Sequence, residues 1–306
     1  MCGIVAYLGN QEAYPILING LKRLEYRGYD SAGVALLTNN DELNVYKTSG
    51  KVSNLEHYAE TLDKSGNIGI AHTRWATHGE PNNINAHPHC SQSNRIALIH
   101  NGIIENYLIL KKSLEKRGYV FKSSTDTEVL TNLIEEVQLT EKVDLFEAVR
   151  IALTQVVGAY AIVVMEKGHP HELIAARKGS PMVIGIGENE YFIASDATPI
   201  VGKTTHVVYM EDEQVAKIKL GEELHVKTIS DVDITPNIQE LQLDLESIEK
   251  GGYEHFMLKE IYEQPSTVRD TMRGRLHPEL GTVTLGGIMD YEKKILNARS
   301  IIFVAC

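Results

Sequence analysis

The middle of this 306-residue chain limits its fold most, because it is a series of short apolar segments separated by turn-forming Gly, Asn, Asp and Lys residues. The segments cover 159–165, 173–177, 182–186, 191–194, 206–210, 215–220 and 224–228. Segments of this length, bounded by turn residues, are typical of strands joined by short connections. Helical periodicity is confined mostly to the part before them, so the pattern favours an α+β fold with antiparallel sheets over a doubly wound parallel sheet.

The part before this tract mixes helical and strand periods. Apolar residues recur at helical spacing in 13–24, 52–62, 107–116 and 144–156, and apolar runs typical of strands occur at 2–9, 32–38, 43–48, 68–73 and 96–100. Thr125 and Glu128 stand three residues apart before another apolar helical pattern, which predicts a capping box and a helix start.

The composition changes after the strand-rich tract. The acidic stretch 231–249 has one proline and no strong strand signal, which indicates a linker. Helical spacing returns in 253–273, with Pro265 expected to interrupt or kink the helix. The apolar run 300–306 is typical of a buried parallel strand, and its place at the end of the chain indicates a truncated second domain. We therefore expect a first domain at 1–240, a linker at 241–252 and the start of a second domain at 253–306.

Composition excludes several classes of protein. A formal charge of −11 argues against binding nucleic acid through its phosphates. The cysteines Cys2, Cys90 and Cys306 make a poor disulfide set, which indicates a reducing, cytoplasmic location. We expect no membrane span and no secretory signal, since the chain lacks a long unbroken apolar run and a basic start followed by an apolar stretch.

Cys2 is the first candidate for chemistry. If Met1 is removed, a thiol and a free α-amine share one residue. The α-amine has an unperturbed pKa of about 7.7–8.0, so at neutral pH it can serve as a base beside the nucleophile. The alternative is a small buried hydrophobic residue at the start of a strand, and position alone does not decide between the two.

Three further sites carry groups that amide hydrolysis needs. Asn101 and Gly102 offer an amide and an unshielded backbone N–H to an oxyanion, although Asn-Gly is also a common turn. Arg74, in a polar stretch after a strand, suits a carboxylate, and the alternative is a solvated surface arginine. Asp126 suits an ammonium group, but an acid in the first turn of a helix is favoured anyway.

A group of histidines near Cys90 also suggests a metal site. His78, His87 and His89 lie in the same polar stretch. A structural zinc site usually combines paired Cys or His ligands, four in total, and no second pair is present. We expect neither a metal nor a cofactor.

Several segments together resemble one family. The segments 2–5, 25–33, 72–79 and 100–106 are similar to those of class II glutamine amidotransferases, which belong to the N-terminal-nucleophile (Ntn) hydrolases. The segments 124–128 and 259–265 narrow the resemblance to glutamine–fructose-6-phosphate aminotransferases, also called glucosamine-6-phosphate synthases. The resemblance extends over essentially the whole chain.

The resemblance implies a role for each candidate residue. Cys2 would attack the carboxamide of glutamine, with its own amine as the base. Asn101 and Gly102 would form the oxyanion hole. Arg74 would bind the carboxylate of glutamine, and Asp126 would bind its ammonium group.

It also implies the fold and the partners. Thr77 and His78 would lie with Arg74 in a loop that closes on glutamine, and Trp75 would gate a passage for ammonia. The first domain would be a four-layer αββα sandwich of two antiparallel sheets, followed by a truncated α/β sugar-isomerase domain. L-glutamine would be the substrate; fructose 6-phosphate and a homodimeric state would belong to the full-length enzyme.

Two departures from the family pattern bear on this expectation. Ala6 stands where the family usually has glycine, a small packing change. The chain ends at Cys306, before the residues that would bind the sugar phosphate, so we expect it to hydrolyse glutamine without making glucosamine 6-phosphate.

Three other functions stay open at this point. The chain could be the glutaminase part of another class II enzyme, such as an amidophosphoribosyltransferase or asparagine synthetase. It could be a binding module in which Cys2 only packs. It could also be a zinc-binding interaction module.

Overall fold

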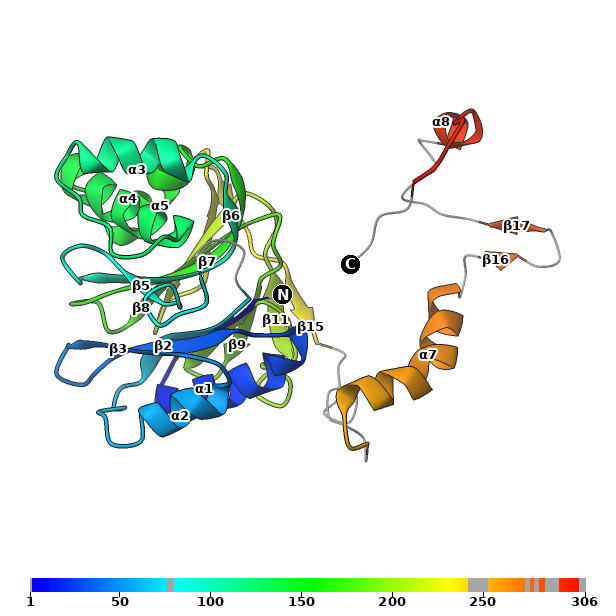
Figure 1. The fold of residues 1–306 in the computed structure, drawn as a ribbon, viewed down its shortest axis with the longest axis horizontal. Coiled ribbons are helices and arrows are strands. Elements are labelled where there is room, and N and C mark those ends of the chain that lie inside the picture. Colours follow the sequence, from blue (N-terminus) through cyan, green and yellow to red (C-terminus); the bar gives the residue numbers. More distant parts are fainter. Residues whose placement is uncertain are drawn as a thin grey trace. The chain divides into compact units, whose positions relative to one another are not determined.

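The computed structural model describes residues 2–75, 80–241, 253–272, 276–277, 281–283 and 292–302. The chain divides into two compact units, Met1–Ile248 and Glu249–Cys306 (Figure 1). The first unit contains two large sheets. The division into domains at 1–240 and 253–306, and the isomerase fold of the second, stay predictions.

Two antiparallel sheets form the centre of the first unit. The eight-stranded sheet has the order β15 (Ile238–Glu240), β11 (His206–Tyr209), β9 (Val183–Gly187), β10 (Glu190–Ala194), β1 (Gly3–Leu8), β4 (Ile68–Arg74), β2 (Ser31–Leu37) and β3 (Leu43–Ser49). The seven-stranded sheet has the order β14 (Asp233–Ile234), β13 (His225–Thr228), β12 (Gln214–Lys219), β8 (Glu172–Lys178), β7 (Gly158–Glu166), β6 (Ile96–Ile104) and β5 (His89–Cys90). The short segments of 159–228 thus become antiparallel strands, as predicted.

Along each buried strand, side chains point alternately to the apolar core between the two sheets and to the apolar core under the helices of that sheet. In β1, Ile4, Ala6 and Leu8 face the core between the sheets, whereas Val5 and Tyr7 face the helices on the outside. The strands β6 and β7 alternate in the same way, which explains why these strands read as continuous apolar runs. Ala6 is fully buried, so its methyl group is accommodated in the core between the sheets.

Helices cover the outer face of each sheet. The helices α1 (Ala13–Leu24) and α2 (Val52–Tyr58) pack on the eight-stranded sheet, and α3 (Tyr107–Glu115), α4 (Asp126–Glu141) and α5 (Leu145–Leu153) pack on the seven-stranded sheet. Figure 1 shows these two helical layers on opposite sides of the sheets. The predicted αββα sandwich is confirmed.

The helix start predicted from the Thr125–Glu128 spacing is confirmed, since α4 begins at Asp126 with Thr125 as its N-cap. The Thr125 hydroxyl accepts a hydrogen bond from the backbone N–H of Glu128 at 3.3 Å. The Glu128 carboxylate, however, accepts from the N–H groups of Lys122 and Ser123 at 2.9 and 2.6 Å. It therefore fixes the segment that leads into the helix, next to Asp126, which the sequence predicted as a site residue.

The structure differs from the sequence prediction in the acidic stretch 231–249. Both β14 and β15 lie within it, and β15 pairs with β11 at the edge of the eight-stranded sheet. All three residues of β15 are exposed, so this strand has no apolar pattern that could have predicted it. Its backbone pairing with β11 holds it in the sheet.

The second unit contains α7 (Phe256–Met272), a short pair formed by β16 (Leu276–His277) and β17 (Thr282–Val283), and α8 (Glu292–Leu296). The helix α7 continues through Pro265, so the proline does not end it. Ile301 and Ile302 lie outside any strand, and the rest of the predicted terminal strand lies outside the described residues. Among the helices that the structure describes, none has the length and apolar character to cross a membrane.

Candidate active site

Strand pairing brings Cys2 next to Trp75. Because β1 and β4 are antiparallel with Gly3 opposite Thr73, the same register continued by one residue puts Cys2 opposite Arg74 and next to Trp75. The Trp75 backbone N–H donates a hydrogen bond to Cys2 Sγ at 3.2 Å, and Sγ lies 3.5 Å from the Trp75 carbonyl oxygen. Cys2 is half-buried, so its thiol is held by the backbone but remains reachable.

The groups around Cys2 shift the pKa of its thiol in opposite directions. Burial raises the pKa of the Cys2 thiol, while the hydrogen bond from Trp75 and the charge of Arg74 lower it; burial is the larger influence. The thiol is therefore mostly protonated at neutral pH, and a nucleophilic role requires a base that takes its proton.

The second sheet contributes Asn101. This residue lies on β6, and its Nδ2 group donates a hydrogen bond of 3.2 Å to the Cys2 carbonyl oxygen, across 99 positions of sequence. Its Oδ1 atom is 2.8 Å from Nε2 of His72 on β4. Both ends of the carboxamide are thus held where the two sheets meet, next to Cys2.

Gly102 follows inside β6, not at the end of the strand as the sequence predicted. The strand continues to Ile104, and Gly102 pairs with Tyr160 of β7. Its φ is +135°, and a Cβ atom placed on it would lie 2.0 Å from the carbonyl oxygen of Ala159. Only glycine fits both this φ and this approach, so the strand keeps a bare backbone next to Asn101.

Arg74 is the last residue of β4 and is buried, so it is neither in the predicted loop nor on the surface. Its carbonyl oxygen accepts a hydrogen bond of 2.6 Å from the N–H of Asp30, which ties the strand end to the turn before β2. The Arg74 charge lowers the pKa of Cys2 and of neighbouring buried histidines, which places a fixed cation beside the thiol.

Asp126 is the first residue of α4 and is 5% exposed. Its Oδ2 atom accepts a hydrogen bond of 2.8 Å from the N–H of Ile104 and lies 4.0 Å from Nδ1 of His100. The carboxylate is therefore anchored to β6 two residues beyond Gly102, and the positive end of the helix dipole favours its charge.

Trp75 leaves β4 with a side chain that is 55% exposed. A Cβ atom on Gly28 would lie 2.8 Å from two atoms of the indole ring, so the ring rests directly on the Gly28 backbone. Thr77 and His78, the other predicted residues of this segment, lie outside the described residues.

Four buried histidines, His72, His87, His89 and His100, form a cluster next to the site. The ring of His87 stacks on that of His72 with centroids 4.4 Å apart. His89 Nε2 and His100 Nδ1 hydrogen-bond the hydroxyls of Thr125 and Thr127, on either side of Asp126. Burial lowers the pKa of all four, to about 3 for His72, so the rings are neutral near pH 7.

The cluster changes the interpretation of His87 and His89, which the sequence suggested as zinc ligands. Their nitrogens are directed to separate partners, and in the part of the chain that the structure describes no group of three or more His, Cys, Asp or Glu side chains could hold a metal ion. Sequence reasoning did not assign a role to His72 or His100. Each of these histidines lies in an apolar strand segment. This position could have indicated a buried ring with a polar partner, since buried polar groups need partners.

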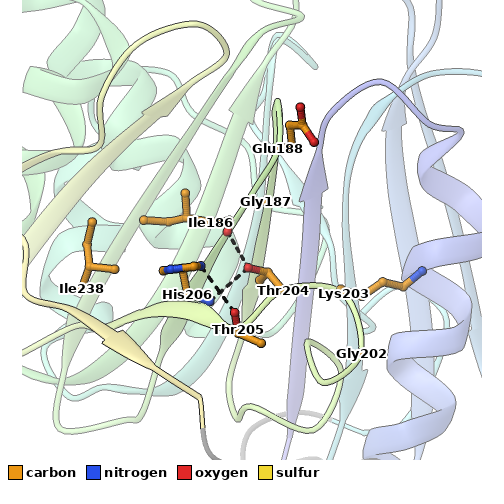
Figure 2. Close-up of a pocket in the computed structure, with 9 residues that line it drawn as sticks. All are labelled: Ile186, Gly187, Glu188, Gly202, Lys203, Thr204, Thr205, His206 and Ile238. Atoms are coloured by element: carbon orange, nitrogen blue, oxygen red, sulfur yellow. Dashed lines mark hydrogen bonds between the residues drawn. The ribbon is translucent and has the colours of Figure 1, made fainter.

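A separate pocket of about 650 Å³ lies by β9, β11 and β15 (Figure 2). It is lined by Ile186, Gly187, Glu188, Gly202, Lys203, Thr204, Thr205, His206 and Ile238. The Thr204 hydroxyl donates to the Ile186 carbonyl and accepts from the His206 N–H at 3.1 Å, so these groups already pair with one another. None of the predicted site residues lines this pocket.

Comparison with known proteins identifies a family match that includes Arg74, Asn101 and Asp126. Residues 72–202 match a family described as a glutamine amidotransferase domain. The chain is 61% identical over its whole length to the glutamine–fructose-6-phosphate aminotransferase (isomerizing) of Bacteroides thetaiotaomicron and 53% identical to that of Chlorobaculum tepidum, and it covers 50% of each. The chain thus spans about half the length of the curated relatives it matches.

Solved structures share the fold. The glutamine phosphoribosylpyrophosphate amidotransferase of B. subtilis, in complex with ADP and GMP, is 29% identical with a TM-score of 0.63. The match covers 74% of this chain and 49% of that one. A second structure, described as the allosteric regulatory enzyme of purine biosynthesis, is 30% identical with a TM-score of 0.64 and the same coverage.

Proposed function

We propose a glutaminase reaction for this chain, which belongs to the glutamine amidotransferase family. The Cys2 thiol attacks the side-chain amide carbon of L-glutamine, ammonia leaves, and water then cleaves the thioester to give L-glutamate and the free thiol. The observation that carries the proposal is the hydrogen bond of 3.2 Å from Asn101 Nδ2 to the Cys2 carbonyl oxygen. It brings a side-chain amide donor of one sheet to the nucleophile of the other.

The base in this proposal is the α-amine of Cys2, set free by removal of Met1. Because burial raises the pKa of the thiol, a base is needed at neutral pH. The amine has an ordinary pKa of about 7.7–8.0 and sits on the same residue, so it can take the thiol proton during attack. It can then pass that proton to the departing ammonia.

Asn101 and Gly102 are assigned to the oxyanion. The tetrahedral intermediate carries negative charge on the former amide oxygen, and a fixed donor at that oxygen is worth about 10²- to 10³-fold in rate. Gly102 is held firmly in place for this role, since its backbone packs against the Ala159 carbonyl oxygen and the strand around it pairs with β7.

Arg74 and Asp126 are assigned to the α-carboxylate and the α-ammonium group of glutamine. The charge signs match, and both side chains are almost completely buried, which strengthens their interaction with a charged ligand. The buried histidines are neutral and add no positive charge here, whereas the Arg74 charge acts on Cys2. Thr77 and His78 are proposed to join this binding site from the segment after Trp75.

Trp75 is proposed to gate the path by which ammonia leaves. Its backbone touches Cys2 Sγ, while its indole is largely exposed and rests on Gly28. A change in the Trp75 backbone would therefore alter the nucleophile and the indole position together.

The activity of the whole protein is a further proposal. The relatives that match the full chain are named glutamine–fructose-6-phosphate aminotransferases, and the chain spans about half of their length. We infer that ammonia made at Cys2 passes to fructose 6-phosphate to give glucosamine 6-phosphate, and that the full-length protein is a homodimer. A reducing cytoplasmic location suits a thiol nucleophile.

Ammonia and glutamate release from L-glutamine by the purified chain tests the proposed reaction. Mass spectrometry first establishes that Met1 is absent. We expect the C2A variant to lose activity, whereas C90A, which removes the other free thiol in the described part of the chain, keeps it. Activity in C2A equal to that of the parent chain would reject Cys2 as the nucleophile, and a trimmed parent chain that releases no ammonia would leave a binding module as the better interpretation.

A further inference from the structure

His72 and Asn101 form a hydrogen bond buried between the two sheets. His72 Nε2 lies 2.8 Å from Asn101 Oδ1, with His72 fully buried and Asn101 8% exposed. A carboxamide has an acceptor end and a donor end, and rotation by half a turn about its last bond exchanges them. With Oδ1 on His72, the Nδ2 donor is directed to Cys2, whose carbonyl oxygen it meets at 3.2 Å.

This contact determines where the ring proton of His72 lies. Asn101 Oδ1 can only accept a hydrogen bond, so His72 Nε2 must carry the proton. In a neutral ring Nδ1 then bears a lone pair. Within the described residues, the buried Nδ1 atom has no hydrogen bond of ordinary geometry, although the His100 backbone lies close enough to the ring to raise its pKa slightly against the larger effect of burial.

The surroundings hold the ring in this state. His87 stacks on His72 at a centroid distance of 4.4 Å, and His87 is in turn fixed because its Nδ1 accepts the backbone N–H of His100 at 3.3 Å. Burial and the nearby Arg74 charge lower the pKa of His72 to about 3. A second proton on the ring is thereby disfavoured at neutral pH.

We propose that His72, as the neutral Nε2–H imidazole, is the positioning residue that holds the Asn101 carboxamide with its NH₂ group toward Cys2. The inference rests on the proposed glutaminase function and concerns the oxyanion donor of that site. Without a donor at Nε2, the carboxamide can turn its oxygen toward the reacting centre, where it would repel an oxyanion.

Two substitutions separate this role from packing. H72F keeps a ring of similar size but removes the donor, and H72Q places a side-chain amide donor near the former Nε2 position. We expect H72F to lower kcat about 10-fold or more, up to the roughly 10²- to 10³-fold that loss of an oxyanion donor costs, with KM for glutamine nearly unchanged. H72Q should recover part of kcat.

A double-mutant cycle with N101A tests the coupling. If His72 acts through the Asn101 carboxamide, H72F should have little further effect on kcat in the N101A background. The control is H89F, which also removes a buried ring but one bonded to Thr125, and its effect should add to that of N101A. An unchanged kcat in H72F, or the same loss with and without the Asn101 amide, would overturn the inference.

The protonation state provides a test that does not depend on activity. In the full chain labelled with ¹⁵N-histidine, the His72 ring, assigned by its loss in H72Q, should be protonated at Nε2 and bare at Nδ1 near neutral pH. A proton on Nδ1, or a doubly protonated ring, would refute the proposal. An inactive chain that nevertheless shows the Nε2–H ring would refute the glutaminase function while leaving this positioning intact.

Discussion

The backbone N–H of Trp75 donates a hydrogen bond of 3.2 Å to Cys2 Sγ, although the two residues are 73 positions apart. The pairing of β1 with β4 brings the two segments together, since Gly3 stands opposite Thr73 and Trp75 lies one residue beyond the position opposite Cys2. The proposed nucleophile is therefore positioned by the backbone of β4 instead of by a side chain that a single substitution could remove. The same register places Arg74 beside it.

Gly102 should be the least replaceable glycine of the site. A Cβ in G102A would lie 2.0 Å from a backbone oxygen at a φ of +135°, so the strand must shift. We expect a loss of unfolding free energy above the roughly 1–2 kcal/mol that an unfavourable φ alone costs, together with a lower kcat. Chemical denaturation and the glutaminase assay measure the two effects.

The matched control for that substitution is G168A. Gly168 also has a positive φ, +89°, but nothing lies within 4 Å of its added Cβ. The unfolding free energy of G168A should fall only by what the unfavourable φ costs, and the variant should keep its activity. Equal destabilisation of G102A and G168A would contradict the close approach between β6 and β7.

Asp126 should determine the affinity for glutamine more than the rate. D126N keeps an oxygen that can accept from the Ile104 N–H but removes the charge. We expect KM to rise about 10- to 100-fold, from the loss of about 1.5–3 kcal/mol of a charged hydrogen bond, with a smaller change in kcat.

D144N serves as its comparison in the same steady-state assay. Asp144 caps α5 and accepts from the Glu147 N–H at 2.9 Å, so this variant also neutralises an acid at a helix start. Its KM should not change. If D126N and D144N behave alike, Asp126 is only a helix-start residue and the assignment of the ammonium site is wrong.

The buried histidines should tie stability to pH. Burial lowers their pKa, to about 3 for His72, whereas an exposed imidazole in the unfolded chain titrates near 6.5. Between those values the unfolded chain binds more protons. The stability is therefore fully present above about pH 6.5 and falls as the pH drops, by about 1 kcal/mol per pH unit for each histidine.

Urea unfolding at a series of pH values checks this dependence. In the H72Q variant the unfolding free energy should depend less steeply on pH. The difference should correspond to about one proton fewer taken up on unfolding, because one neutral buried ring is missing. Equal unfolding free energies of the parent chain at about pH 7 and pH 5 would mean that these rings can be protonated in the folded state.

Local patterns predicted the sheets well because strands that are buried on both faces have continuous apolar sequences. The apolar run of β1 and the short segments of 159–228 follow from strands packed between two cores. The strand β15 could not be predicted in this way, since its residues are exposed and only backbone pairing with β11 holds it.

The site itself was less accessible to local reasoning. Considered alone, Asn101-Gly102 suggested a turn and Arg74 a loop or surface residue, yet all three are strand residues. The contact of Asn101 with Cys2 depends on how two sheets stack, which no local pattern encodes. The resemblance to a family supplied the site, and the structure then added the histidine cluster that supports it.

The most direct test of the central claim is the intact mass of the chain before and after exposure to 6-diazo-5-oxo-norleucine, a glutamine mimic that alkylates a reactive thiol. We predict loss of Met1 and a single adduct on Cys2, with none on C2A and protection by excess glutamine. A retained Met1, or a trimmed chain that takes up no adduct, would contradict a terminal cysteine nucleophile in a glutamine-binding site.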